Sequence, residues 1–234
     1  MLRRSADYTN SQSLAYRLRR KRFEQFLDLL DQLPRPVSIL DVGGTETFWQ
    51  SMGIGELADV SVSLLNIAPC ETNTPNTTSL VGDGCDLSRF DDGGFDVVFS
   101  NSVIEHVGTW EHQQRMAGEI RRVGRSYFVQ TPNFYFPIEP HFQFPCFQFL
   151  PLRLRVKLLR SRPIGWYPQA ECNEQAAAWA NEIRLLSRRE FARLFPEARI
   201  VAERYWCLAK SYMAIHLDPS AKRSERAVAL EAAC

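Results

Sequence analysis

The stretch from Val37 to Thr47, which reads VSILDVGGTET, constrains the fold of this chain more than any other. Its first residues are apolar and partly β-branched, as in a short buried strand, and Asp41 ends that strand. Gly43 and Gly44 then supply a tight turn, and a helix-like stretch follows. This order opens a doubly wound α/β domain, in which ligands bind at the carboxyl ends of the strands. The alternative is a plain corner between strand and helix.

Length and composition limit the classes of protein to consider. The 234 residues suit one domain with an insertion or a small cap, and 45% hydrophobic with 24% charged residues is ordinary for a globular protein. A net charge of +1 argues against binding nucleic acid by bulk electrostatics. The six cysteines contain no CxxC pair, which fits neither a zinc site nor a disulfide framework. The start lacks a signal-peptide core and no apolar run is long enough to span a membrane, so we expect a cytoplasmic protein.

Hydrophobic periodicity divides the chain into alternating helices and strands. Because most of the strands are separated by helical segments, we expect parallel βαβ units with right-handed crossovers. Residues 1–36 are expected to form an arm and a helix, residues 37–216 the main domain, and residues 217–234 a flexible tail. The expected strands are 37–40, 60–66, 77–81, 95–100, 127–130, 199–204 and 207–216, and the expected helices are 13–33, 46–57, 110–123, 152–159 and 187–195. Ser187 and Glu190 form a predicted capping box at the last helix.

Residues 133–182, between the fifth and sixth strands, differ in composition from the rest. Aromatic residues crowd the first half of this segment, and prolines interrupt them. The pattern predicts an irregular aromatic insertion with a basic helix behind it. Such an insertion would form a lid that excludes water and favours an apolar or lipid-like acceptor. The alternative is a compact secondary core.

Four segments in order resemble the class I S-adenosylmethionine (SAM)-dependent methyltransferases, specifically the small bacterial type 11 group. They read ILDVGGTET, LLNIAP, VGDGCDLSRF and FDVVFSNSVIEHV. The resemblance covers residues 37–129 and 187–216. It implies a seven-stranded, doubly wound, mostly parallel Rossmann-like sheet with an antiparallel last strand. It also implies SAM as the cofactor.

The resemblance implies which residues would meet SAM. The glycine turn would pass under the methionine part, Asn66 would bond the ribose hydroxyls, and Asp83 would accept from the adenine amino group. Asn66 and Asp83 have the alternative of simply turning the chain at strand ends. The cofactor-binding residues expected are Asp41, Gly43, Gly44, Thr45, Asn66, Asp83, Gly84, Cys85, Ser100, Asn101 and Ser102. Threonines at 45 and 47 replace family glycines and Asn66 replaces an acid, which makes weak SAM affinity an open alternative.

Methyl transfer from a sulfonium mainly requires that the nucleophile be positioned, and a base is needed only if the acceptor must lose a proton. His141, with Glu139 beside it, follows the fifth strand and is the best-placed catalytic candidate. The alternative is that both residues fix a proline-rich loop. The expected substrate-binding residues are His106, Phe134, Tyr135 and Phe142.

No metal site is expected from the sequence. Some related methyltransferases carry an E-x-x-E-H site here, but its first position is Ser102 in this chain. Glu105 and His106 alone make a poor metal site. His106 is therefore interpreted as structural or as lining the cofactor cleft.

The sequence thus predicts a SAM-dependent methyltransferase acting on a small, apolar or lipid-linked acceptor. A non-catalytic binding module with the same fold is the alternative. An NAD-dependent oxidoreductase fits less well, because the turn lacks G-x-G-x-x-G. Two basic runs suggest weak association with an anionic membrane surface, and their alternative is a solvated face. These runs are Arg17, Arg19, Arg20, Lys21 and Arg22, and Arg153, Arg155, Lys157, Arg160 and Arg162.

Overall fold

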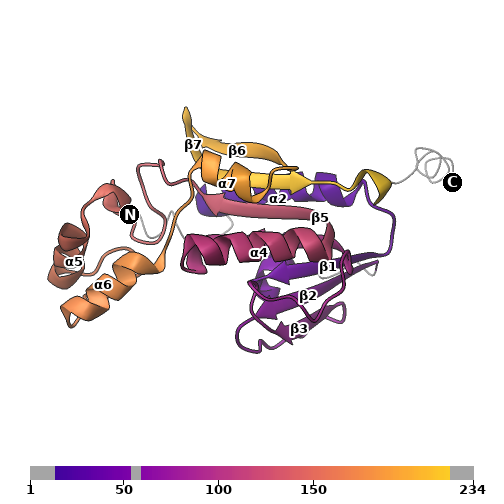
Figure 1. Cartoon of the computed structure of the whole chain (residues 1–234), viewed down its shortest axis with the longest axis horizontal. Coiled ribbons are helices and arrows are strands. Elements are labelled where there is room, and N and C mark those ends of the chain that lie inside the picture. The colour runs from indigo at the N-terminus through magenta and orange to yellow at the C-terminus, as the bar shows by residue number, and fades with distance from the viewer. Residues whose placement is uncertain (1–13, 54–58, 222–234) are drawn as a thin grey trace.

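A seven-stranded sheet with the order β3-β2-β1-β4-β5-β7-β6 forms the centre of the protein (Figure 1). The structure is a computed structural model that describes residues 14–53 and 59–221, so the expected arm (1–12) and residues 222–234 of the expected tail lie outside the described residues. The five strands β3-β2-β1-β4-β5 pair in parallel with their neighbours, and β7 lies between β5 and β6 and is antiparallel to both. This arrangement confirms the predicted fold class. The strands are β1 (Val37–Val42), β2 (Val60–Asn66), β3 (Thr77–Val81), β4 (Phe95–Asn101), β5 (Gly124–Pro132), β6 (Arg199–Tyr205) and β7 (Leu208–His216).

Helices cover both faces of the sheet, and in Figure 1 α4 runs in front of it and α2 behind it. The helices are α2 (Leu14–Leu30), α3 (Glu46–Met52), α4 (Trp110–Val123), α5 (Leu152–Ser161), α6 (Asn173–Glu182) and α7 (Arg188–Leu194). Short 3-10 helices are η2 (Ile104–His106), η3 (Phe147–Phe149) and η4 (Pro219–Ala221). No helix among these described segments is long and apolar enough to cross a membrane.

An aromatic cluster fastens α2 and α3 to one face of the sheet. Phe26 of α2 packs edge-on against Phe99 of β4, with ring centroids 4.7 Å apart, and Phe99 stacks on Phe128 of β5. Trp49 of α3 is buried and meets both Phe26 and Phe99. Aromatic pairs of this kind add about 0.5–1.5 kcal/mol each beyond the burial of their area. The helix before β1 is thereby part of the main core.

The opposite face is closed by α4 and α7. Met116 and Ile120 of α4 and Phe191 of α7 are fully buried in one cluster with Tyr127 of β5. The N-terminus of α7 carries the predicted capping box: the Ser187 side chain accepts from the Glu190 backbone N–H, and Glu190 accepts from the Ser187 backbone N–H. The expected helix 110–123 is also observed with the same bounds.

The segment between β5 and α7 (residues 133–187), called the lid from here on after the sequence prediction, stands apart from the sheet in Figure 1. Helices α5 and α6 pack on each other, and the lid has its own core, in which Phe142, Phe147 and Leu159 are buried. A secondary core is therefore present. Helix α6 was not predicted, because its Ala-rich sequence has no apolar stripe and Cys172 is an unusual N-cap.

Two elements, α3 and β5, differ most from the sequence prediction in their boundaries. Helix α3 ends at Met52 instead of reaching residue 57, because Gly53 takes a left-handed conformation (φ 81°) and caps the helix. The rest of the predicted extension, residues 54–57, lies outside the described residues. Strand β5 starts at Gly124, directly after α4, and is longer than predicted because it pairs with β4 on one side and β7 on the other.

Candidate functional site

The glycine turn after β1 opens the carboxyl edge of the sheet. Gly43 has φ of 80°, its N–H donates to the Leu65 carbonyl at 2.8 Å, and a Cβ added there would lie 2.5 Å from Val103 Cγ2. Only glycine combines that backbone with that space. Thr45, which stands where the family has glycine, is the N-cap of α3 and accepts from the Phe48 N–H at 3.3 Å. The threonine thus starts the helix that follows the turn.

Asp41 lies beneath this turn and is fully buried. Its Oδ2 accepts a hydrogen bond from Trp49 Nε1 at 2.7 Å. Burial raises the pKa of the Asp41 carboxyl to about 7, against the opposing effect of the Trp49 bond. Asp41 therefore joins β1 to α3 from below, whereas Gly43 is exposed at the surface of the edge.

The ends of β2 and β3 lie beside the turn. Asn66 donates from Nδ2 to the Gly44 carbonyl at 2.9 Å, and the Gly82 N–H donates to the Asn66 carbonyl. Asp83 is exposed, and its Oδ1 accepts from the Cys85 N–H at 2.8 Å. Cys85 is buried, and burial raises the pKa of its thiol to about 11, so the thiol stays neutral. The structure thus brings the predicted Asn66 and Asp83 to the same edge as the glycine turn.

Polar residues at the exit of β4 connect the neighbouring strands. Ser100 is buried, and its hydroxyl donates to the Val42 carbonyl of β1 at 3.1 Å. Asn101 is half-buried at the end of β4. Ser102 has a positive φ of 60°, and its hydroxyl donates to Gln130 Oε1 of β5 at 2.8 Å. These bonds fix where η2 begins.

A cluster of histidine and glutamate side chains follows. Glu139 is buried and accepts from the backbone N–H groups of His141 and Phe142, while its other oxygen lies 2.5 Å from His141 Nδ1. The second ring nitrogen of His141, Nε2, lies 3.1 Å from His106 Nε2. Hydrogen bonding and electrostatic attraction to Glu139 raise the pKa of His141 above its usual value in spite of burial. The predicted Glu139–His141 pair therefore exists, and His106 belongs to it.

Arg184 attaches the returning end of the lid to this cluster. Its Nη1 donates to Gln113 Oε1 at 2.6 Å and its Nη2 donates to Glu190 at 2.7 Å. Its backbone N–H donates to the Glu105 carbonyl at 2.9 Å, and Gln113 Nε2 donates to the Ile104 carbonyl. The fully buried Gln113 thus positions η2 between α4 and the lid.

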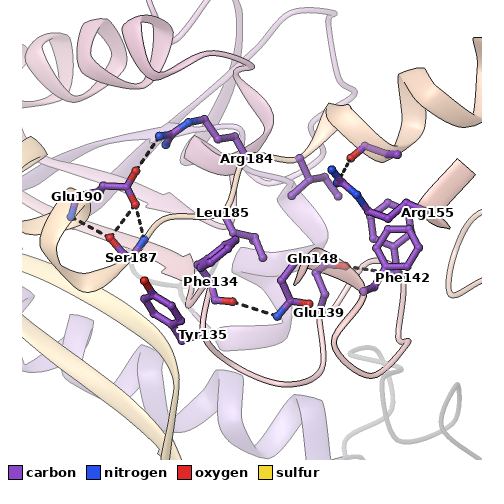
Figure 2. Close-up of a pocket in the computed structure, with 13 residues that line it drawn as sticks. Phe134, Tyr135, Glu139, Phe142, Gln148, Arg155, Arg184, Leu185, Ser187 and Glu190 are labelled. Atoms are coloured by element: carbon purple, nitrogen blue, oxygen red, sulfur yellow. Dashed lines mark hydrogen bonds and ion pairs between the residues drawn. The ribbon is translucent and has the colours of Figure 1, made fainter. Parts of the chain in front are cut away.

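A cavity of about 530 Å³ lies between the lid and α7. Figure 2 shows its wall, with Phe134 and Tyr135 on one side and Arg155 with Phe142 on the other. Of the predicted substrate-binding residues, Phe134, Tyr135 and Phe142 line this cavity, as does the predicted catalytic Glu139. His106 and the predicted catalytic His141 are not in its wall. The wall residues not predicted from the sequence include Gln148, Arg155, Arg184, Ser187 and Glu190. Arg155 belongs to the second basic run, for which the sequence suggests weak membrane association or a solvated face, and a single sequence gives no signal that this side chain lines a cavity.

The strand order and the polar edge define a Rossmann-like fold of the class I methyltransferase type. Residues 41–127 match the family model described as "Methyltransferase domain". Together with the sheet order, this match identifies residues 41–127 as a domain similar to the class I SAM-dependent methyltransferases, which use SAM as their cofactor. It confirms the resemblance found in the sequence.

Among curated proteins, uncharacterized proteins of Mycobacterium tuberculosis strains CDC 1551 and H37Rv are 40% identical to this chain over 62 residues. That segment is 26% of this chain and only 21% of each relative. A solved structure described as a possible exported protein from Bordetella parapertussis is 11% identical, with a TM-score of 0.50 over 85% of this chain and 68% of its own. A SAM-dependent methyltransferase from Methanosarcina mazei is 16% identical, with a TM-score of 0.46 over 81% of this chain and 97% of its own.

The residues at the sheet edge fit SAM. Gly43 and Gly44 have no side chains that would keep a ligand away from the backbone of the turn. An added Cβ would meet Val103 at Gly43 and Asp41 at Gly44. Asn66 and Asp83 place an amide and a carboxylate at the next two strand ends, which suits a ligand with ribose hydroxyls and an adenine amino group. Bound there, SAM supplies an activated methyl group.

Proposed function

We propose that this protein transfers the methyl group of SAM to a small, largely apolar acceptor held in the lid cavity. The observation that supports this most is the position of that cavity. Its wall includes the loop that leaves β5, on the same carboxyl edge as the glycine turn. In doubly wound sheets ligands bind at this edge, and a lid over it excludes water from a reaction.

The cavity wall suggests what the acceptor looks like. Phe134, Tyr135 and Phe142 offer aromatic surfaces for an apolar body. Two polar atoms nearby have no hydrogen-bond partner among the described residues: Arg155 Nε and Gln148 Oε1. Buried polar atoms are normally paired, so we expect the acceptor to carry a polar group at that end. Arg155 would donate to it, and the aromatic rings would orient the rest.

Glu139 and His141 are the residues that we propose to activate the acceptor. Glu139 holds the His141 ring through Nδ1, which leaves Nε2 as the working nitrogen. If the acceptor atom carries a proton, Nε2 of His141 would accept it as the atom attacks the methyl group. His106, beside this nitrogen, would contact the acceptor or support His141.

Incubation of the purified protein with isotopically labelled SAM and cell extract tests this proposal. A labelled product that disappears when Phe142→Ala replaces the wild type would support it. Arg155→Met should raise the acceptor KM more than it lowers kcat, whereas Arg153→Met, at an exposed position on the same helix, should change neither. SAM binding without any labelled product would instead indicate a binding module. The proposed partners are a small-molecule or lipid-like acceptor and, weakly, an anionic membrane surface, with no nucleic acid.

A further inference from the structure

His106 and His141 meet at the carboxyl edge of the sheet although 35 positions separate them. His106 ends η2, just after β4, and His141 lies in the loop after β5. Their Nε2 atoms face each other at 3.1 Å. Glu105 adds a carboxylate oxygen, and one donor atom from each of the three residues lies within 4.8 Å of the others. Two imidazole nitrogens and a carboxylate therefore converge on one point.

Glu139 fixes His141 in the orientation that this convergence needs. One of its oxygens pairs with His141 Nδ1 and the other accepts from the His141 backbone N–H at 2.8 Å. Histidines that bind metal ions usually bond their second nitrogen to a carboxylate or carbonyl in this way. Because Nδ1 is used, Nε2 is the atom left to bind, and it is the atom that faces His106.

The Glu105 carboxylate is the third potential ligand. Its side chain is fully buried, Oε2 accepts from the Thr131 hydroxyl at 3.1 Å, and Oε1 has no partner among the described residues. Leaving a buried carboxylate oxygen unpaired is costly unless a cation or a donor meets it. Glu139, a second buried carboxylate, stands on the other side of His141.

We propose that Glu105, His106 and His141 bind one divalent transition-metal ion, with Zn²⁺ as the best-fitting example. With metal–nitrogen bonds of about 2.0–2.1 Å, two nitrogens 3.1 Å apart subtend an angle of roughly 100° at the ion. Two histidines and one glutamate are a donor set for Zn²⁺ that leaves a position open for a further ligand. Mg²⁺ and Ca²⁺ prefer oxygen and should bind much more weakly.

Local sequence offers only Glu105 and His106 as metal ligands, which are too few for a metal site. The third donor comes from the lid, and local sequence spacing does not reveal it. Ion binding does not depend on the proposed methyl transfer. The use of the ion does rest on that function: Glu139 lines the acceptor cavity and pairs with His141 Nδ1, so the ion at Nε2 would be one imidazole ring away from this part of the cavity wall. With the ion bound, Nε2 of His141 is a ligand and does not accept a proton, so an acceptor hydroxyl or amine that reaches the open position would lose its proton to solvent, attack the methyl carbon and release S-adenosylhomocysteine.

The test begins with protein stripped by a chelator and titrated with Zn²⁺, Co²⁺ and Mg²⁺ by calorimetry. We expect one Zn²⁺ per chain, a Co²⁺ complex with visible absorption bands, and at least tenfold weaker Mg²⁺ binding. His106→Ala and His141→Ala should each weaken Zn²⁺ binding at least tenfold, as should Glu105→Gln, which retains the shape and the Thr131 contact. His112→Ala, an exposed histidine of α4, should bind as the wild type does.

Circular dichroism and SAM titration of each stripped variant show whether the fold and the cofactor edge remain. Absence of stoichiometric Zn²⁺ binding to the folded wild type would overturn the proposal and leave an imidazole–imidazole hydrogen bond. Binding that survives both histidine substitutions would also overturn it, because neither imidazole would then be a ligand of the ion. Zn²⁺ binding without methyl transfer would keep the site and reject the proposed function.

Discussion

The carboxyl group of Asp41 lies directly under Gly44, where the Cβ of any other residue would overlap it. Asp41 is held there by Trp49 Nε1 at 2.7 Å. The second glycine of the turn is therefore required by packing from below, as well as by any ligand above. The turn, the strand before it and the helix after it form one rigid unit.

Gly44→Ala should lower the free energy of unfolding by about 1–3 kcal/mol, because the Cβ must displace a buried and hydrogen-bonded carboxyl. Urea titration followed by circular dichroism measures this. Gly118→Ala is a matched control on α4: an added Cβ meets nothing within 4 Å, and alanine favours a helix, so stability should stay level or rise by about 0.5–1 kcal/mol. Equal losses in both variants would contradict the packing argument.

Asp41 should make stability fall as pH rises. Its pKa in the folded protein is about 7, above the ordinary value of 3.8, so the folded state holds more protons between those values. The free energy of unfolding therefore declines from about pH 4 to pH 7, and the full cost remains above pH 7. Each unit of pKa difference corresponds to roughly 1.4 kcal/mol, so the effect is on the order of a few kcal/mol.

Asp41→Asn retains an acceptor for Trp49 and removes the ionisation. Its free energy of unfolding should exceed that of the wild type at pH 8, and the difference should shrink toward pH 4. Chemical unfolding at several pH values measures both curves. A difference that is independent of pH would show that Asp41 does not titrate in this range.

Asp83→Ala should weaken SAM binding about tenfold or more, since the carboxylate at the end of β3 would no longer accept from the cofactor. Asp86→Ala, in the same exposed turn, serves as the control and should bind SAM as the wild type does. Calorimetry gives both dissociation constants. Wild-type affinity in Asp83→Ala would remove that residue from the cofactor site.

His141→Ala should lower turnover by about 10²–10⁴-fold and leave SAM affinity nearly unchanged, because His141 lies in the lid and not in the glycine turn. Steady-state kinetics and SAM calorimetry separate these two effects. Glu139→Gln should lower turnover less, since an amide can still accept from the backbone N–H groups of His141 and Phe142. A rise in acceptor KM with kcat retained would mean that His141 only orders the lid.

Helix α5 is the element most suited to weak membrane association. Leu152 and Leu154 are about 39% and 48% exposed beside Arg153 and Lys157, while Arg155 and Arg160 are bonded to backbone carbonyls. We expect binding to anionic vesicles that disappears in high salt, and none to neutral vesicles. Vesicle sedimentation measures this, with Arg153→Glu/Lys157→Glu as the altered surface. Equal binding to both vesicle types would indicate ordinary solvated faces.

The sequence determined the parts of this protein that depend on local patterns. The strand and glycine turn around Gly43, the alternation of strands and helices, and the capping box of Ser187 and Glu190 all involve residues close together in the chain. Their physics is local: backbone freedom, hydrophobic period and terminal hydrogen bonds. The order of these units predicted parallel βαβ units, and the resemblance of four segments to the class I methyltransferases implied the seven-stranded doubly wound sheet.

Tertiary structure decided which distant side chains meet. His106 and His141 face each other only because η2 and the loop after β5 end at the same edge. Arg155, a member of a basic run, lines the cavity because α5 packs on α6 and its guanidinium donates to the Ala180 carbonyl of that helix. Burial raises the pKa of the Glu105 and Asp41 carboxyls, and this burial depends on neighbours far away in the sequence.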